Sequence, residues 1–162
     1  MDIGKIINAM IAYYEGDVRR INHFIKVYGF AKAIGAMEGL DAATQEILEI
    51  AAVTHDIGIK NSEKKYNSAS GSYQQVEGPP EAQMLLGNLG YSPSVIDRVC
   101  WLIAHHHTYD HITEMDYQIL VEADFLVNAF EDQLSLTAIQ QVAKKIFKTP
   151  AGLDFLNKLY RG

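Results

Sequence analysis

Histidine is the residue type whose placement in this chain most clearly indicates chemistry. The chain has six histidines, and four of them fall within seven residues. The clustered four are His105, His106, His107 and His111, and the two that stand apart are His23 and His55. Neutral imidazole is a frequent ligand of transition-metal ions and titrates near neutral pH, so this pattern predicts metal binding or proton transfer. Metal storage by the dense cluster would account for four of the histidines, but it leaves the isolated two unexplained.

Two aspartates lie in segments that are otherwise apolar, and one of them directly follows the second isolated histidine. The segment 47–53 is almost wholly apolar and leads into His55-Asp56, and Asp124 lies among aliphatic residues in the segment 117–128. Burying a carboxylate is costly unless it is paired or binds a metal. A lone buried histidine or helix-interior aspartate is more often a hydrogen-bonded core residue. Three such features on three segments, with His23 as the third, favour one common metal site.

The segment around Asp124 carries two polar stripes. Glu122 and Asp124 lie about 200° apart around a helix, so they cannot both face water if one side is packed. Gln118 belongs to the first stripe and Asn128 to the second. One stripe must therefore point inward toward a polar site, and the aliphatic flanks of Asp124 select that residue.

The elements that must position these residues are predicted to be helices throughout, because no run of period-2 alternation indicates a strand. Caps and prolines predict seven helices, over residues 18–37, 42–56, 79–89, 93–106, 114–130, 135–148 and 150–160. Gly58 is expected to let the chain turn after the second of these. Residues 59–78, rich in Ser and Asn, are predicted to form a loop of roughly 20 residues. The whole of 1–162 is predicted to be one all-α domain.

Composition excludes several classes of protein. The chain has 162 residues, 48% of them apolar, a net charge of −6 and a single cysteine, Cys100. These values are typical of a globular domain and not of a disordered chain or a coiled coil. One cysteine allows neither an intrachain disulfide nor a zinc finger, and the acidic balance argues against general nucleic-acid binding. No signal peptide and no apolar run of membrane-spanning length is apparent, so we expect a cytoplasmic protein without a membrane partner.

The ordered set of ligands resembles the HD domain family of metal-dependent phosphohydrolases. That family has a His on one helix, a His-Asp dyad ending a later helix, and an Asp on a helix further along; here these are His23, His55-Asp56 and Asp124. The resemblance covers about residues 18–130, with the C-terminal helices 135–160 beyond it. It implies a compact helical bundle that holds a divalent ion (Mn, Fe, Zn, Co, Ni or Mg). It also implies hydrolysis of a small phosphoester, such as a nucleotide, by metal-activated water.

The same resemblance implies further site residues. Glu77, His105 and His106 occupy the positions at which two-metal members hold a second ion, with Asp56 as the bridge. Asp56, His105 and His106 are the implied catalytic residues. The implied substrate-binding residues are Arg20, Lys60 and His107. The chain departs from the family pattern twice, because Lys60 is displaced by one residue and Glu77 replaces a histidine. His111 is expected to be a solvated loop residue.

Two other functions fit the same pattern. A di-iron oxygenase on the same fold would also need the second ligand set, and iron content with oxygen consumption would identify it. A non-catalytic ligand-sensing module of this fold commonly lacks the His-Asp dyad, which this chain retains. The sequence leaves open the substrate, the metal, the number of ions and the oligomeric state.

Overall fold

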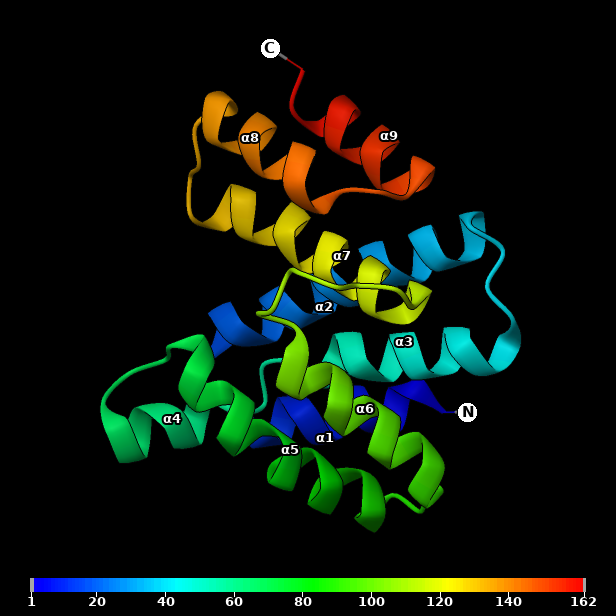
Figure 1. The fold of residues 1–162 in the computed structure, drawn as a ribbon. Coiled ribbons are helices and arrows are strands. Elements are labelled where there is room, and N and C mark those ends of the chain that lie inside the picture. Colours follow the sequence, from blue (N-terminus) through cyan, green and yellow to red (C-terminus); the bar gives the residue numbers. More distant parts are fainter. Residues whose placement is uncertain (1, 162) are drawn as a thin grey trace.

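The computed structural model describes residues 2–161, which form nine helices and no strand in that range (Figure 1). The helices are α1 (Ile3–Tyr13), α2 (Val18–Met37), α3 (Ala42–Thr54), α4 (Ile59–Tyr66), α5 (Gly71–Asn88), α6 (Pro93–His105), α7 (Met115–Glu131), α8 (Leu136–Ile146) and α9 (Pro150–Leu159). The all-α prediction is confirmed. No helix among these residues combines the length and apolarity needed to cross a bilayer.

The centre of the bundle is built from α2, α3 and α7. Residues Leu48–Thr54 of α3 are all buried, as are most residues of α7, because both helices are covered on most sides. Helix α2 packs against α3 and α7, while α1 and α6 pack against α3. Figure 1 shows α8 and α9 (orange and red) covering α7 at one end of the bundle, and α4 and α5 (green) at the opposite end of the bundle. The C-terminal end of α3 and the middle of α7 therefore meet in the interior.

The helix starts follow the capping residues for the most part. Asp17 accepts a hydrogen bond from Arg20 N at 3.2 Å, Asp41 accepts from Thr44 N at 2.9 Å, and Thr149 Oγ1 accepts from Gly152 N at 2.9 Å. Ser92 differs: it precedes Pro93 as expected, but its hydroxyl pairs with that of Ser94 and caps no backbone group. The fixed φ of proline starts α6 without that bond.

The predicted loop over residues 59–78 is wrong for most of its length. Helix α4 occupies its first half and α5 begins at Gly71, so only residues 67–70 are non-helical. Asn67 ends α4 in a left-handed conformation, with φ of 52°. The polar composition is accommodated because Ser62 is buried and its hydroxyl donates to the Gly58 carbonyl at 2.8 Å. Pro79 and Pro80 consequently lie inside α5 and do not open it.

Two helices raise the count from the expected seven to nine. One is α4, and the other is α1, whose Ile6 and Met10 are buried one turn apart against the core. The short α1 was not expected from the sequence, and Asp2, which precedes it, makes no side-chain cap. Packing of one apolar face supplies the stability that local signals did not predict.

The chain turns over residues 55–58 as expected, but the turn requires glycine at position 58 for a different reason from backbone freedom. The φ of −74° at Gly58 is right-handed and open to any residue. A Cβ built on it would lie 2.7 Å from Gly78 N and 2.9 Å from Gln74 O. Glycine is therefore required because the backbones of the His55–Gly58 turn and α5 approach each other closely.

Candidate metal centre

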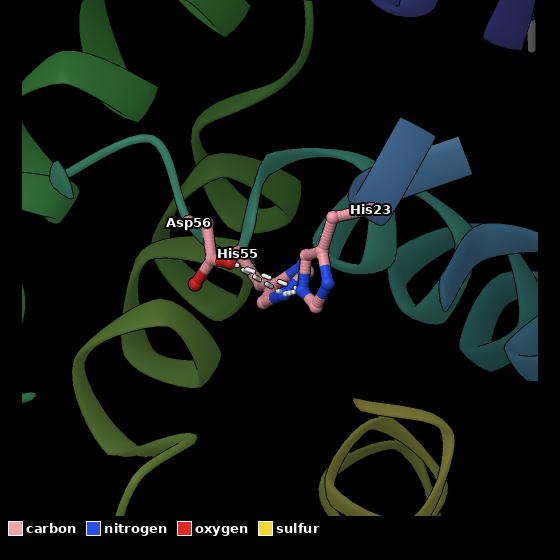
Figure 2. A group of neighbouring side chains, drawn as sticks. All are labelled: His23, His55 and Asp56. Atoms are coloured by element: carbon pink, nitrogen blue, oxygen red, sulfur yellow. Dashed lines mark hydrogen bonds and ion pairs between the residues drawn. The ribbon is translucent and has the colours of Figure 1, made fainter. Parts of the chain in front are cut away.

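Four side chains from two helices and one turn converge at one point. His23 comes from α2, His55 and Asp56 from the turn that follows α3, and Asp124 from α7. His23 Nε2 lies 3.2 Å from His55 Nε2, from Asp56 Oδ2 and from Asp124 Oδ1. His55 Nε2 lies 3.3 Å from Asp56 Oδ2 and 3.2 Å from Asp124 Oδ1. Figure 2 shows His23, His55 and Asp56 pointing toward one another. The structure thus brings together all four residues predicted as the first ligand set.

These separations fit the ligands of one divalent ion. Two ligands bound at about 2.1 Å lie about 3.0 Å apart at a right angle and about 3.4 Å apart in a tetrahedron. The observed separations of 3.2 to 3.3 Å fall between these values. The donor set has imidazole and carboxylate but no thiolate, which suits a catalytic ion better than a closed structural zinc.

Hydrogen bonds at Nδ1 fix the orientation of the ligating rings. His55 Nδ1–H donates to the Ala52 carbonyl at 2.7 Å, and His23 Nδ1–H donates to the carboxylate of Glu131. A histidine that donates through Nδ1 presents the lone pair of Nε2 to a metal. Glu131 was not among the site residues expected from the sequence, although it lies seven residues after Asp124 and so on the same face of α7.

A second group of ligand atoms adjoins the first. It comprises Asp56, His106 and His107, whose ligand atoms lie within 4.8 Å of one another. His106 Nδ1–H donates to the Ile103 carbonyl at 2.7 Å, so its Nε2 is a free acceptor. That Nε2 is completely buried, has no hydrogen-bond partner, and lies 3.5 Å from Asp56 Oδ1. An orphaned buried nitrogen beside a carboxylate is the environment expected where a second cation binds.

The structure does not bring His105 or Glu77 into either group. The His105 ring stacks on Trp101 with centroids 4.0 Å apart, and its Nδ1–H donates to the Trp101 carbonyl. One residue along a helix rotates a side chain by about 100°, which separates His105 from its neighbour His106. The Glu77 carboxylate accepts from Lys65 Nζ at 2.9 Å and from Tyr66 hydroxyl at 3.1 Å. His107 takes the position in the second group that we expected His105 to take.

Electrostatics in the cluster favour positive charge. Burial opposes ionisation of His23, but the facing carboxylates of Asp124 and Asp56 outweigh it and raise the pKa of His23 to about 10. The same two aspartates hold the pKa of His55 well above its usual range against the effect of burial. The pKa of Asp56 is lowered, because the charge of His55 outweighs the burial that would raise it. Ionised carboxylates at this depth provide the negative field that a cation requires.

His107 has the opposite shift. Burial and the neighbouring His106 lower the pKa of His107 to about 4, so its ring is neutral near pH 7. Its Nε2 lies 3.2 Å from Gln74 Oε1. A neutral imidazole is the form that a metal or a hydrogen-bonding substrate can use.

Three residues of the first group, His23, Asp56 and Asp124, line a cleft of about 440 Å³, and His55 is buried behind them. The cleft is lined by Asp17, Arg19, Arg20, His23, Asp56, Ile59, Ala69, Gln74, His107, Asp124, Asn128, Glu131 and Asp132. Two of the three predicted substrate-binding residues, Arg20 and His107, are among them. Lys60 is not: its Nζ donates to the Tyr13 carbonyl at 2.9 Å and lies over the Tyr13 ring. His111 is solvated as expected, with its side chain 93% exposed.

Asp124 points inward as expected, and Gln118 and Glu122 of the other polar stripe of α7 are buried as well, whereas Asn128 is half-buried. Asp124 faces His23 and His55, whereas Glu122 faces the start of α9. Glu122 accepts hydrogen bonds from the Lys148 and Thr149 backbone N–H groups, each at 3.1 Å, and from the Thr149 hydroxyl at 2.6 Å. Its burial is compensated by these donors, so it anchors α9 and takes no part in the cluster.

Comparison with known proteins agrees with this geometry. The family model described as HD domain matches residues 20–146, which include every ligand of both groups. A crystal structure of a predicted HD superfamily hydrolase from an uncultured Thermotogales bacterium is similar, with a TM-score of 0.69 and 24% identity. That similarity covers 97% of this chain and 84% of the other, and it concerns the fold. No significant match is found among curated proteins. With its family model matched across most of its length and the ordered ligands in one cluster, the chain belongs to the HD domain family.

Proposed function

We propose that the protein is a metal-dependent phosphohydrolase that cleaves a small phosphoester with water. The observation that carries the proposal is the convergence of His23, His55, Asp56 and Asp124 at one point, three of which line the cleft. Membership of the HD domain family supports it. The similar crystal structure, described as a predicted hydrolase, is in line with it.

The first ligand set would hold one ion, and Asp56, His106 and His107 would hold a second. The second set replaces the Glu77 and His105 expected from the sequence. When bound, such ions act as Lewis acids that lower the pKa of coordinated water and offset charge on the phosphoryl group. Mn, Fe, Zn, Co, Ni and Mg all accept imidazole and carboxylate ligands in catalytic sites of this kind.

The residues of the chain supply the remaining functions. Asp56 directs Oδ2 toward His23 and His55 and Oδ1 toward His106, so one carboxylate serves both groups. Arg20 lines the cleft and is held by Asp17 and Glu63, which fixes its position for a phosphate oxygen. In the reaction the water oxygen bonds to phosphorus, the ester P–O bond breaks, and the leaving alcohol takes a proton.

The test combines metal analysis with turnover. We expect purified protein to contain one or two divalent ions per chain by elemental analysis, and to hydrolyse p-nitrophenyl phosphate when loaded. His55→Ala and Asp56→Ala should lose both metal and activity. His111→Ala is the matched control, because this histidine is solvent-exposed, and it should retain both. Full activity in metal-stripped Asp56→Ala protein would refute the proposal.

Two other outcomes identify the competing functions. Iron as the bound metal with oxygen consumption and no phosphate release would indicate a di-iron oxygenase. Calorimetric binding of a nucleotide without turnover under any of the six metals would indicate a ligand-sensing module.

A further inference from the structure

A tyrosine hydroxyl from outside the candidate metal centre contacts the backbone of Asp56. Tyr14 directly follows α1, and only 4% of the residue is exposed. Its hydroxyl donates to the Asp56 carbonyl at 2.7 Å. The same carbonyl accepts from Ile59 N at 3.0 Å, so both of its lone pairs are used. The backbone of Asp56 is therefore held by a side chain that lies 42 residues earlier in the chain.

The Tyr14 hydroxyl also replaces a missing helix cap. Gly58 is the N-cap residue of α4 and has no side chain that could accept from the first N–H groups of the helix. Lys60 N, the second of these groups, donates instead to the Tyr14 hydroxyl at 3.4 Å. Because the close approach to α5 requires glycine at position 58, the cap has to come from another element. One hydroxyl thus ties the Asp56 carbonyl to the start of α4.

The Lys60 side chain joins the same two elements from the solvent side. Its Nζ donates to the Tyr13 carbonyl at 2.9 Å and lies 4.8 Å from the centroid of the Tyr13 ring. Lys60 was expected to bind substrate, but these contacts direct its ammonium group to the end of α1. Two side chains, one from each element, therefore fasten the end of α1 to the start of α4 and to the turn at residues 55–58.

We propose that Tyr14 and Lys60 form a clamp that positions Asp56 between two metal ions. The inference rests on the two ligand groups of the proposed function. The carboxylate of Asp56 points in two directions, with Oδ2 3.2 Å from His23 Nε2 and Oδ1 3.5 Å from His106 Nε2. Because both directions must be kept, the backbone from which the carboxylate projects has to be fixed. Tyr14 is thus a positioning residue that acts through Asp56.

The second ion should depend on the clamp more than the first. Without Asp56 the first group retains three ligands, whereas the second retains only His106 and His107. A misplaced Asp56 therefore removes a larger share of the ligands of the second ion.

The test removes the hydroxyl and keeps the ring. Chelator-competition titration with Mn²⁺ compares metal-free wild type, Tyr14→Phe and Tyr28→Phe. Tyr28→Phe is the matched control, because the Tyr28 hydroxyl donates at 3.3 Å to Glu49 of α3, and neither residue belongs to a ligand group. We expect Tyr14→Phe to weaken binding of the more weakly held Mn²⁺ about tenfold and Tyr28→Phe to leave it unchanged. Each variant loses one hydrogen bond and should have a lower urea midpoint, so the Mn²⁺ affinities separate positioning from a general loss of stability.

Electron paramagnetic resonance reports directly on a shared ligand. Ions of a two-metal site lie about 3.5–4 Å apart, so two Mn²⁺ ions bridged by Asp56 are magnetically coupled and broaden each other's spectrum. At the Mn²⁺ concentration that just saturates wild type, we expect a coupled spectrum in wild type and Tyr28→Phe. Tyr14→Phe should show the sharp spectrum of a single ion at that concentration. An uncoupled spectrum in wild type at every loading would overturn the two-ion role of Asp56.

Lys60→Met is a second test at an exposed side chain, where substitution leaves the fold intact. It removes the hydrogen bond to the Tyr13 carbonyl, so it should weaken Mn²⁺ binding by a smaller factor than Tyr14→Phe. The KM for p-nitrophenyl phosphate should be unchanged at saturating Mn²⁺. A raised KM with wild-type Mn²⁺ affinity would make Lys60 a substrate ligand and overturn its place in the clamp.

The outcomes for the clamp and for the proposed function are distinguishable. Wild-type Mn²⁺ affinity in Tyr14→Phe, or equal weakening in Tyr14→Phe and Tyr28→Phe, would overturn the clamp and leave the phosphohydrolase proposal standing. Absence of turnover in Mn²⁺-loaded wild type would refute the phosphohydrolase function, while the Mn²⁺ affinities would still test the clamp.

Discussion

Replacing Gly58 by alanine tests whether the position of Asp56, a proposed metal ligand, depends on a close approach of two backbones. The added Cβ would meet Gly78 N at 2.7 Å, Gly78 Cα at 2.9 Å and Gln74 O at 2.9 Å. All three are backbone atoms of α5, so no flexible side chain can move aside, and the turn or the helix must shift by about 0.7 Å. Overpacking of this kind costs roughly 1–3 kcal/mol. Because Asp56 lies two residues earlier, the shift should also displace a metal ligand.

The assay is urea and thermal unfolding of metal-free protein, followed by metal titration. We expect Gly58→Ala to lower the free energy of unfolding by about 2 kcal/mol, or Tm by about 4–8 °C for a domain of this size. Gly87→Ala is the matched control. Gly87 is exposed in α5 with nothing within 4 Å of its Cβ position, so alanine there should stabilise by about 0.5 kcal/mol. If Gly58→Ala unfolds at the wild-type midpoint and binds metal with wild-type affinity, the close approach does not position Asp56.

Two further predictions concern the histidine ligands. Glu131→Ala should weaken metal binding about 10–100-fold in a chelator-competition titration, because His23 loses the carboxylate that orients its ring. Glu131→Gln should weaken metal binding less. Equal metal affinity in both variants and in wild type would contradict this role of Glu131. His106→Ala should reduce the metal content of saturated protein by one ion per chain, whereas His105→Ala should leave it unchanged because His105 stacks on Trp101. An equal loss of metal in the two histidine variants would count against the second ligand set proposed here.

The ligand residues of the first set could be predicted because each breaks a local rule. His55-Asp56 ends an apolar helix and Asp124 interrupts an aliphatic one, and burying such groups without compensation is costly. The order of these residues along the chain then led to the HD domain family. Asp17, Asp41 and Thr149 likewise indicated helix starts by local chemistry alone, because a cap contacts residues only two or three positions away.

The second ligand set could not be predicted from the triplet His105–His107. Consecutive residues differ by about 100° in direction along a helix, and which of them faces Asp56 depends on where α6 ends and how it is rotated. The fold ends α6 at His105, which leaves His106 buried beside Asp56 and His105 on Trp101. Glu77 accepts hydrogen bonds from Lys65 and Tyr66. Both residues lie on α4, a helix in a segment that was expected to be a loop.

The sequence by itself determined the helical class, the order of the ligands and the four residues of the first set, since these follow from local periodicity and from the cost of buried charge. Only the tertiary structure decided which residues contact one another: Glu131 and His23, Gly78 and Gly58, and Glu122 and the start of α9. It also decided that His107, and not His105, lies with Asp56 and His106. Each of the three contacts joins residues that are distant along the chain. Their geometry depends on the packing of whole helices, and no local pattern of residue types contains that information.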